Sequence, residues 1–311
     1  MRVVFIGTGE IGVPAMQALV QSSEHQVIGV VTQPDKPVGR DYRIEPPAIK
    51  KALAGAKMSI LQPARIKDRQ SIEEIRALML DVITVMAYRQ ILPRDVLEIP
   101  RIASVNLHAS LLPRWRGAAP IQAAIAAGDS ETGITVIYMD EGLDTGDILL
   151  QRKTDILPTD TGGSLHNRLA QIAPEALLES LRLLAKGDPP RIRQDNALST
   201  YAPKLTREDG KIDWSEPAEV VERKIRAFNP WPGAFTTIAA ESEKPRNLKI
   251  FSASVVDVRG ATGEVLQSDK EVIVAAGIQG LLLGEVQLEG KRRMRAAEFV
   301  RGFPQALGIA Q

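Results

Sequence analysis

The chain has 311 residues, a formal net charge of +1 and 44% hydrophobic residues, which fits a two-domain globular protein and excludes a strong overall attraction for polyanions. It contains no cysteine, so disulfides and thiolate metal sites are excluded and a reducing compartment is favoured. We expect a cytoplasmic protein outside membranes, because no secretory pattern precedes the first predicted strand and no apolar run approaches the ~20 residues of a membrane helix.

The N-terminal residues have the order strand, glycine turn, helix, strand. The two apolar runs are Val3–Ile6 and Gln26–Val31, and Pro14 lies where a helix would begin. This βαβ unit predicts a parallel sheet.

The turn in this unit, Gly7-x-Gly9-x-x-Gly12, matches the fingerprint of dinucleotide-binding proteins. A nicotinamide-dependent oxidoreductase is therefore one alternative. The fingerprint also needs an acidic residue near the end of the second strand, and Asp35 comes later, beyond Pro34. We favour a structural use of the glycines, which allow a tight turn and close packing of the helix on the sheet.

Residues 32–47 predict an irregular loop, because four prolines and a glycine oppose regular structure. Lys36, Arg40 and Arg43 are interleaved there with Tyr42. That composition suits a solvated surface loop and also an arm that contacts the phosphates and bases of RNA.

A buried strand is predicted over Asp81–Met86, followed by the polar segment Ala87–Pro93. Open α/β sheets bind ligands at the carboxyl ends of their strands, so this segment is a candidate ligand site.

The next strand carries Asn106 and His108, two residues apart. Because strand side chains alternate, burial of Val105 and Leu107 would place both polar side chains on the opposite face. His108 is the leading candidate for acid–base chemistry, and Asn106 could donate a hydrogen bond to a developing oxyanion.

Another strand, predicted over Gly133–Met139, leads to a glycine-bracketed loop that contains Asp144. A carboxylate brought close to His108 could fix the imidazole tautomer and raise its basicity. No motif marks a serine, threonine or cysteine nucleophile, which favours direct transfer of a group to an amine. The spacing of histidines and carboxylates does not suggest a zinc site.

The remaining chain predicts a second domain. We place a first domain, built on the parallel sheet, over residues 1–188, a basic linker over 189–205 and a small β-barrel over 206–311, where short strands alternate with glycine turns.

Several motifs resemble the formyltetrahydrofolate-using formyltransferases, and most closely the methionyl-tRNA formyltransferase family. They are Asn106-Leu-His108-Ala-Ser-Leu-Leu-Pro113, its continuation Arg114-Trp-Arg-Gly-Ala-Ala-Pro-Ile-Gln122, Asp144-Thr-Gly-Asp147, Tyr201-Ala-Pro-Lys204 and Phe228-Asn-Pro-Trp-Pro-Gly-Ala-Phe235. Glycinamide ribonucleotide formyltransferases share the first motif but lack the second domain.

The resemblance implies an α/β fold with a Rossmann-like parallel-sheet catalytic domain, followed by an OB-like C-terminal tRNA-binding domain. It implies transfer of a formyl group from 10-formyltetrahydrofolate to the α-amine of methionine on initiator methionyl-tRNA, without a metal and by a monomer. A sugar-nucleotide formyltransferase is the alternative within this chemistry, and a catalytically silent RNA-binding protein is a further one.

The resemblance also assigns residues to roles. The catalytic positions are Asn106, His108 and Asp144. The folate-binding positions are Ser110, Leu111, Leu112, Pro113, Gln90, Ile91 and Leu92. The tRNA-binding positions are Lys36, Arg40, Tyr42, Arg43, Arg114, Arg116 and Lys204.

Three departures from the family pattern stand out. The first turn has Gly9 where the family has proline, and Arg89 replaces a glycine after Ala-Tyr. The arm carries Asp41 and Glu45 where the family has more lysines.

Overall fold

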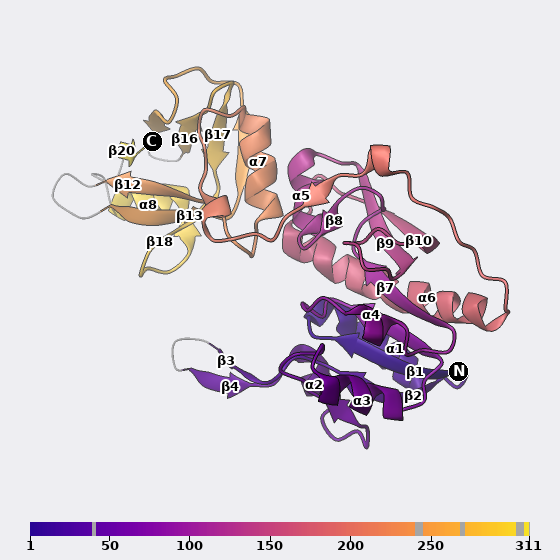
Figure 1. The fold of residues 1–311 in the computed structure, drawn as a ribbon. Helices are drawn as coiled ribbons and strands as arrows, with labels where there is room; N and C mark the ends of the chain where they lie inside the picture. The colour runs from indigo at the N-terminus through magenta and orange to yellow at the C-terminus, as the bar shows by residue number, and fades with distance from the viewer. Residues whose placement is uncertain (39–41, 240–244, 268–270, 303–307, 311) are drawn as a thin grey trace. The chain divides into compact units, whose positions relative to one another are not determined.

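The computed structural model describes residues 1–38, 42–239, 245–267, 271–302 and 308–310, which fall into two compact units (Figure 1). The first unit comprises Met1–Pro120, Glu131–Asp155 and His166–Ala202. The second unit comprises Ile121–Ser130, Ile156–Leu165 and Pro203–Gln311. The domain boundaries drawn from the sequence, at residues 188 and 205, stay predictions.

A seven-stranded sheet forms the centre of the first unit, in the order β10-β9-β7-β6-β1-β2-β5. Its strands are β1 Arg2–Gly7, β2 Gln26–Val31, β5 Ile60–Leu61, β6 Val82–Met86, β7 Ala103–His108, β9 Glu131–Tyr138 and β10 Ile148–Asp155. The five strands from β5 to β7 are parallel, as the βαβ pattern predicts. β9 instead runs antiparallel to β7, and β10 antiparallel to β9.

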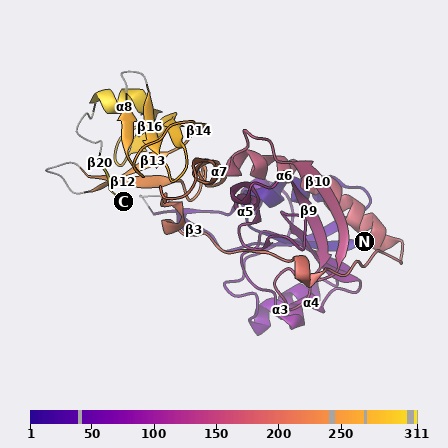
Figure 2. The same ribbon diagram turned by 90° about the horizontal axis from the view of Figure 1, so that it is seen from above.

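Helices accompany this sheet: α1 Val13–Gln21, α2 Ala48–Ala52, α3 Arg69–Ala77, α4 Arg94–Leu97 and the long α6 Gly162–Ala185, with 3₁₀ turns over Glu10–Gly12 and Asn196–Leu198. α6 lies beside β10 (Figure 2), where Arg152 forms ion pairs with Glu175 and Glu179. No helix in the described ranges is both long enough and apolar enough to cross a membrane.

The segment predicted as an irregular loop over 32–47 contains a short hairpin, so that prediction was wrong. β3 Lys36–Val38 pairs antiparallel with β4 Arg43–Glu45. Pro37 is tolerated because a two-stranded ladder leaves one edge of each strand without a partner strand. This hairpin, which we call the arm, extends from the first unit in Figure 1.

The residues after α6 are hydrogen-bonded into the first unit rather than irregular. Ile192 exchanges backbone hydrogen bonds with Ile148 of β10. Further along, β11 Tyr201–Ala202 pairs in parallel with β8 Arg116–Gly117. We call residues 191–202 the strap.

The second unit contains two antiparallel sheets, in the orders β19-β18-β13-β12-β20 and β14-β17-β16-β15. The strands are β12 Phe235–Ala239, β13 Arg246–Ile250, β14 Ala253–Val256, β15 Val265–Gln267, β16 Val272–Ala275, β17 Gly280–Leu283, β18 Glu285–Leu288, β19 Met294–Arg295 and β20 Gly308–Ala310. The helices are α5 Pro120–Ala127, α7 Ala218–Ala227 and α8 Ala296–Gly302, with a 3₁₀ turn over Glu208–Gly210.

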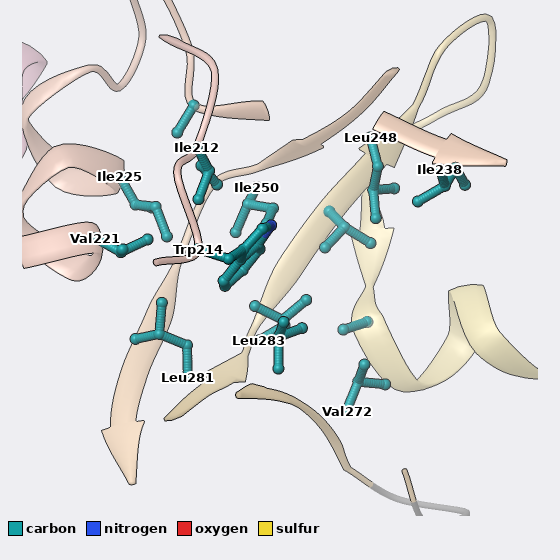
Figure 3. Packing of buried hydrophobic residues seen from close by; sticks show 14 of the residues in the cluster. Ile212, Trp214, Val221, Ile225, Ile238, Leu248, Ile250, Val272, Leu281 and Leu283 are labelled. Carbon is teal, nitrogen blue, oxygen red and sulfur yellow. The ribbon is translucent and has the colours of Figure 1, made fainter. Parts of the chain in front are cut away.

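Trp214 lies in the middle of the hydrophobic core of the second unit, between Ile250 and Leu283 (Figure 3). Its side chain is 4% exposed, and its indole N–H donates a hydrogen bond to Thr236 Oγ1 over 3.1 Å. Val221 and Ile225 of α7 join the same cluster, so one core links the helix to both sheets.

His25, just before β2, is expected to make the stability of the first unit depend on pH. Its ring nitrogens are buried and have no hydrogen-bond partner among the described residues. Burial, helped by the N-terminal amino group, lowers the pKa of His25. The unfolded chain then binds a proton that the folded chain resists, so stability is complete above about pH 6.5 and falls as the pH drops below it.

His25→Leu is expected to remove this part of the pH dependence. The measurement is the free energy of unfolding across the range from about pH 8 to about pH 5, around the unperturbed histidine pKa. His166→Leu, on α6, is the matched control. An unchanged pH slope in His25→Leu would show that the buried imidazole does not destabilise the fold on the acid side.

Candidate active site

Strand β7 presents Asn106 and His108 to the same region of the first unit. Val105 and Leu107 are buried in the core, so the alternation of strand side chains turns the polar pair to the other face. His108 is 6% exposed, and Asn106 is half-buried.

Asp144 reaches this pair from the loop over 139–147. Its Oδ1 lies 3.4 Å from Asn106 Nδ2, and its Oδ2 lies 3.5 Å from His108 Nδ1. The backbone N–H of Gly117 donates a 2.9 Å hydrogen bond to Oδ2. Asp144 has a φ of 54°, in the left-handed region, so its backbone is held in an uncommon conformation.

The position of this loop relative to β7 depends on the direction of β9, which the order of strands in the sheet does not indicate. Tyr138, the last residue of β9, pairs with Val105 rather than lying beyond His108, because β9 runs antiparallel to β7. The loop then folds back over the polar face of β7, where Asp144 meets Asn106.

The contact of His108 Nε2 with a backbone carbonyl defines the neutral tautomer of the ring. Nε2 lies 2.8 Å from the carbonyl oxygen of Trp115, which can only accept, so Nε2 carries a hydrogen. Nδ1, which faces Asp144, is therefore the nitrogen that gains or loses a proton. The site thus contains a basic nitrogen beside a carboxylate and a neutral amide donor.

The turn after β7 is anchored by two polar side chains, the buried Thr135 of β9 and the half-buried Gln151 of β10. Thr135 Oγ1 donates to the carbonyl of Ser110 over 2.6 Å and accepts from the N–H of Leu112 over 3.1 Å. Gln151 Nε2 donates to the carbonyl of Leu112 over 3.0 Å. Leu112 and Ser110 are buried, Leu111 and Pro113 are half-buried, and the Leu112–Pro113 peptide is cis.

The second folate-binding segment predicted from the sequence follows β6. Gln90 is tied to a neighbouring loop, where its side chain accepts from the N–H of Ile66 and donates to the carbonyl of Ala64. Leu92 is buried, whereas Ile91 is 86% exposed. Arg89 has a φ of 71°, so a residue with a Cβ occupies a conformation that favours glycine.

The predicted tRNA-binding residues are distributed over both units. Tyr42 is 78% exposed beside Arg43 on the arm, and Lys36 Nζ lies 3.4 Å from Gln33 Oε1. Arg40 falls outside the described residues. Lys204 is an exposed residue of the second unit.

The two arginines after the folate-binding turn have partners within the first unit. The Arg114 guanidinium lies 5.1 Å from the centre of the Trp115 ring. Arg116 donates to Gln194 Oε1 from Nε and Nη2, over 3.1 and 2.8 Å, and to Asn196 Oδ1 from Nη2. The roles of both arginines in tRNA binding stay predictions.

The glycine turn after β1 has a packing role in this structure. A Cβ on Gly7 would approach the carbonyl oxygen of Met86 to 2.8 Å and the Phe5 ring to 2.6 Å. Asp35, the first acidic residue after β2, accepts hydrogen bonds from Gln62 and Lys50, which hold its pKa below the usual range. Among the described residues, no group of three His, Asp or Glu side chains could hold a metal ion.

Sequence reasoning missed the groups that hold the three polar side chains in place. They are the Trp115 carbonyl, the Gly117 N–H, Thr200, whose Oγ1 accepts from the N–H of Trp115 over 2.8 Å, and Gln194. Two of these are backbone groups, which carry no residue-type signal. The other two lie in the strap, about which periodicity says nothing.

Comparison with known proteins places this geometry in a family. Residues 1–181 match the model of the formyl transferase family, and residues 204–304 match that of the formyl transferase C-terminal domain. A methionyl-tRNA formyltransferase of Methylacidiphilum infernorum is 48% identical over 99% of this chain and 97% of its own length. One of Akkermansia muciniphila is 45% identical over 99% of both chains. The chain belongs to the methionyl-tRNA formyltransferase family.

Solved structures agree on the fold of this formyltransferase. Methionyl-tRNA formyltransferase from Clostridium thermocellum has a TM-score of 0.58 at 20% identity, over 93% of this chain and 98% of that one. HypX from Aquifex aeolicus, solved in complex with tetrahydrofolic acid, has a TM-score of 0.63 at 18% identity, over 99% of this chain and 48% of that one. The predicted fold class, a parallel-sheet formyltransferase domain followed by a smaller β-rich domain, is confirmed.

Proposed function

We propose that this formyltransferase moves the formyl group of 10-formyltetrahydrofolate to the α-amine of methionine on initiator methionyl-tRNA, for translation initiation. The observation that carries the proposal is the convergence of Asn106, His108 and Asp144, with contacts of 3.4 and 3.5 Å to the carboxylate. Relatives named methionyl-tRNA formyltransferase match nearly the whole chain, which supports methionyl-tRNA as the acceptor.

In the proposed mechanism, His108 Nδ1 accepts a proton from the attacking amine, because Nε2 keeps its hydrogen on the Trp115 carbonyl. Asp144 Oδ2 stabilises the imidazolium that results. The amine nitrogen bonds to the formyl carbon, whose oxygen becomes the tetrahedral oxyanion, and the bond from that carbon to folate N10 breaks when the oxyanion collapses. The transferred proton ends on N10 as tetrahydrofolate leaves. Activity should fall on the acid side, because a protonated amine cannot attack and a protonated imidazole cannot accept.

Asn106 is placed to stabilise the tetrahedral oxyanion. Its Nδ2 lies 3.4 Å from Asp144 Oδ1, which is long for a hydrogen bond, so this N–H retains donor capacity for a substrate oxygen. No residue need form a covalent intermediate, because the amine is itself the nucleophile.

The folate co-substrate would lie against the turn 110–113 and the segment 90–92. The exposed side chain of Ile91 is an apolar surface that a pterin ring would cover. HypX, which shares the fold, was solved with tetrahydrofolic acid. The anchoring of Ser110 and Leu112 by Thr135 gives the turn a fixed shape before folate arrives.

The arm, Arg114, Arg116 and Lys204 are the proposed contacts to tRNA. We also propose a cytoplasmic monomer whose catalytic domain spans 1–188, whose linker spans 189–205 and whose OB-like tRNA-binding domain spans 206–311. The exposed Tyr42 supports this role, because an aromatic ring beside cationic side chains can stack on an unpaired base.

The deciding experiment is formylation of methionine-charged initiator tRNA with 10-formyltetrahydrofolate, compared with methionine-charged elongator tRNA. We expect N-formylmethionyl-tRNA to form faster on the initiator. Formylation of an amino-sugar nucleotide in place of methionyl-tRNA would favour the sugar-nucleotide alternative. Tight NAD(P) binding without folate binding would favour an oxidoreductase, and tRNA binding without turnover would favour a silent RNA-binding protein.

A further inference from the structure

The strap carries a buried glutamine whose hydrogen-bonding capacity is directed at the Asp144 loop. Gln194 is 6% exposed, although it lies in the polar strap of the first unit. Its Nε2 donates to the carbonyls of Asp144 and Gly146, over 2.8 and 2.7 Å. Its Oε1 accepts two hydrogen bonds from Arg116. Both amide hydrogens and both acceptor positions of the side chain are therefore used.

These bonds form part of a closed ring around Asp144. Gln194 holds the main chain of Asp144, and Arg116 holds Gln194. Gly117, next to Arg116 on β8, donates its N–H to the carboxylate of Asp144. Residues 27 and 50 positions away in the sequence thus fix the side chain and the backbone of Asp144.

Close packing at Gly146 leaves the backbone of this loop little room to move. A Cβ on Gly146 would lie 1.7 Å from the carbonyl oxygen of Tyr138, so the loop passes directly against the end of β9. Asp144 adopts a left-handed conformation two residues earlier. An L-residue in that conformation needs surrounding contacts to hold it, and the two carbonyl bonds from Gln194 supply them.

We propose that Gln194 is a positioning residue that sets the distance and direction of the Asp144 carboxylate toward His108 Nδ1. This inference rests on the proposed function for its kinetic consequences. The physical reason is that proton transfer and charge stabilisation depend on sub-ångström placement of the carboxylate, which the loop backbone determines. Gln194 acts through Asp144 and makes no contact with substrate.

Two variants test the proposal. Gln194→Glu keeps the shape but loses both N–H donors and sets a carboxylate against two carbonyls. Gln194→Met keeps the length and removes every hydrogen bond. In both we expect kcat to fall about 10- to 100-fold, with KM for methionyl-tRNA and for folate within about threefold of wild type. Asn196→Ala is the matched control, since Asn196 also accepts from Arg116 but is not one of the residues that close the ring on Asp144, and it should retain wild-type kcat.

A double-mutant cycle separates positioning from general destabilisation. In an Asp144→Asn background, single-turnover rates should fall less than about threefold on adding Gln194→Met, because the carboxylate that Gln194 positions is already gone. Losses that multiply in the double variant would overturn the proposal, and so would a wild-type kcat in both Gln194 variants.

Hydrogen exchange gives a readout that does not depend on the reaction. The amides of residues 139–147 should exchange faster in Gln194→Met than in wild type or Asn196→Ala, in the absence of substrates. If the wild-type protein formylated no methionyl-tRNA while the loop still loosened, the proposed function would fail and the positioning contact would stand. Unchanged exchange in the loop would overturn the contact itself.

Discussion

His108→Ala should lower kcat for formylation of methionyl-tRNA by about 10²- to 10⁴-fold, the usual contribution of general acid–base catalysis. The imidazole is 6% exposed and held between the Trp115 carbonyl and the Asp144 carboxylate, so water cannot easily replace it as a directed base. Single-turnover formylation with saturating folate would measure the effect on chemistry.

Binding should survive this substitution. The predicted tRNA-contacting side chains do not include His108, so the Kd for charged tRNA, measured by filter binding, should stay within about threefold of wild type, less than the ~1.4 kcal/mol of a tenfold change. His166→Ala is the histidine control. His166 lies on α6 rather than on β7, and its Nδ1 lies 3.3 Å from Asn167 Oδ1. Near-full activity in His108→Ala would remove the proposed base from the mechanism.

Trp214→Ala should cost the second unit about 3–5 kcal/mol of stability, the range measured for large-to-small substitutions of buried aromatic residues. The change empties the centre of the cluster in Figure 3 and deprives the buried Thr236 hydroxyl of its donor. Since a unit of this size has only a modest stability in total, much of that stability would be lost.

The effect should be confined to the second unit. Urea unfolding followed by circular dichroism should show an earlier transition, and amides of β17 should exchange faster while those of β1 keep their protection. Trp231→Ala provides a matched control in the same unit, because Trp231 is 53% exposed and should change stability by no more than about 0.5 kcal/mol. Equal stabilities of the two tryptophan variants would contradict the assigned core.

Local pattern was sufficient for the strands that carry the chemistry. The apolar residues Val105 and Leu107 dictate which way β7 faces, so the shared face of Asn106 and His108 follows from alternation alone. The β-branched run of β6 and the glycine turn after β1 likewise predict buried parallel strands. These features depend on residues that are close together in the sequence, and such local patterns can be recognised in a single sequence.

The direction of a strand and its pairing with distant segments could not be predicted from local pattern. The apolar run that forms β9 reads alike in either direction, so its antiparallel pairing with β7 could not be foreseen. The arm was missed because its prolines oppose central strands but are compatible with an isolated hairpin. Gln194 was missed because a polar side chain that donates hydrogen bonds to carbonyls distant in the sequence belongs to no periodic pattern.

The strap has a consequence for dividing this chain into parts. Because residues 191–202 contribute Gln194 and Thr200 to the surroundings of Asp144 and Trp115, a fragment that stops at the end of α6 would omit part of its own reaction centre. A self-sufficient catalytic fragment has to continue to Ala202, where pairing with β8 ends. Insertions or proteolytic cuts in this short stretch would therefore lower catalytic activity, although both family-matched segments, 1–181 and 204–304, would stay intact.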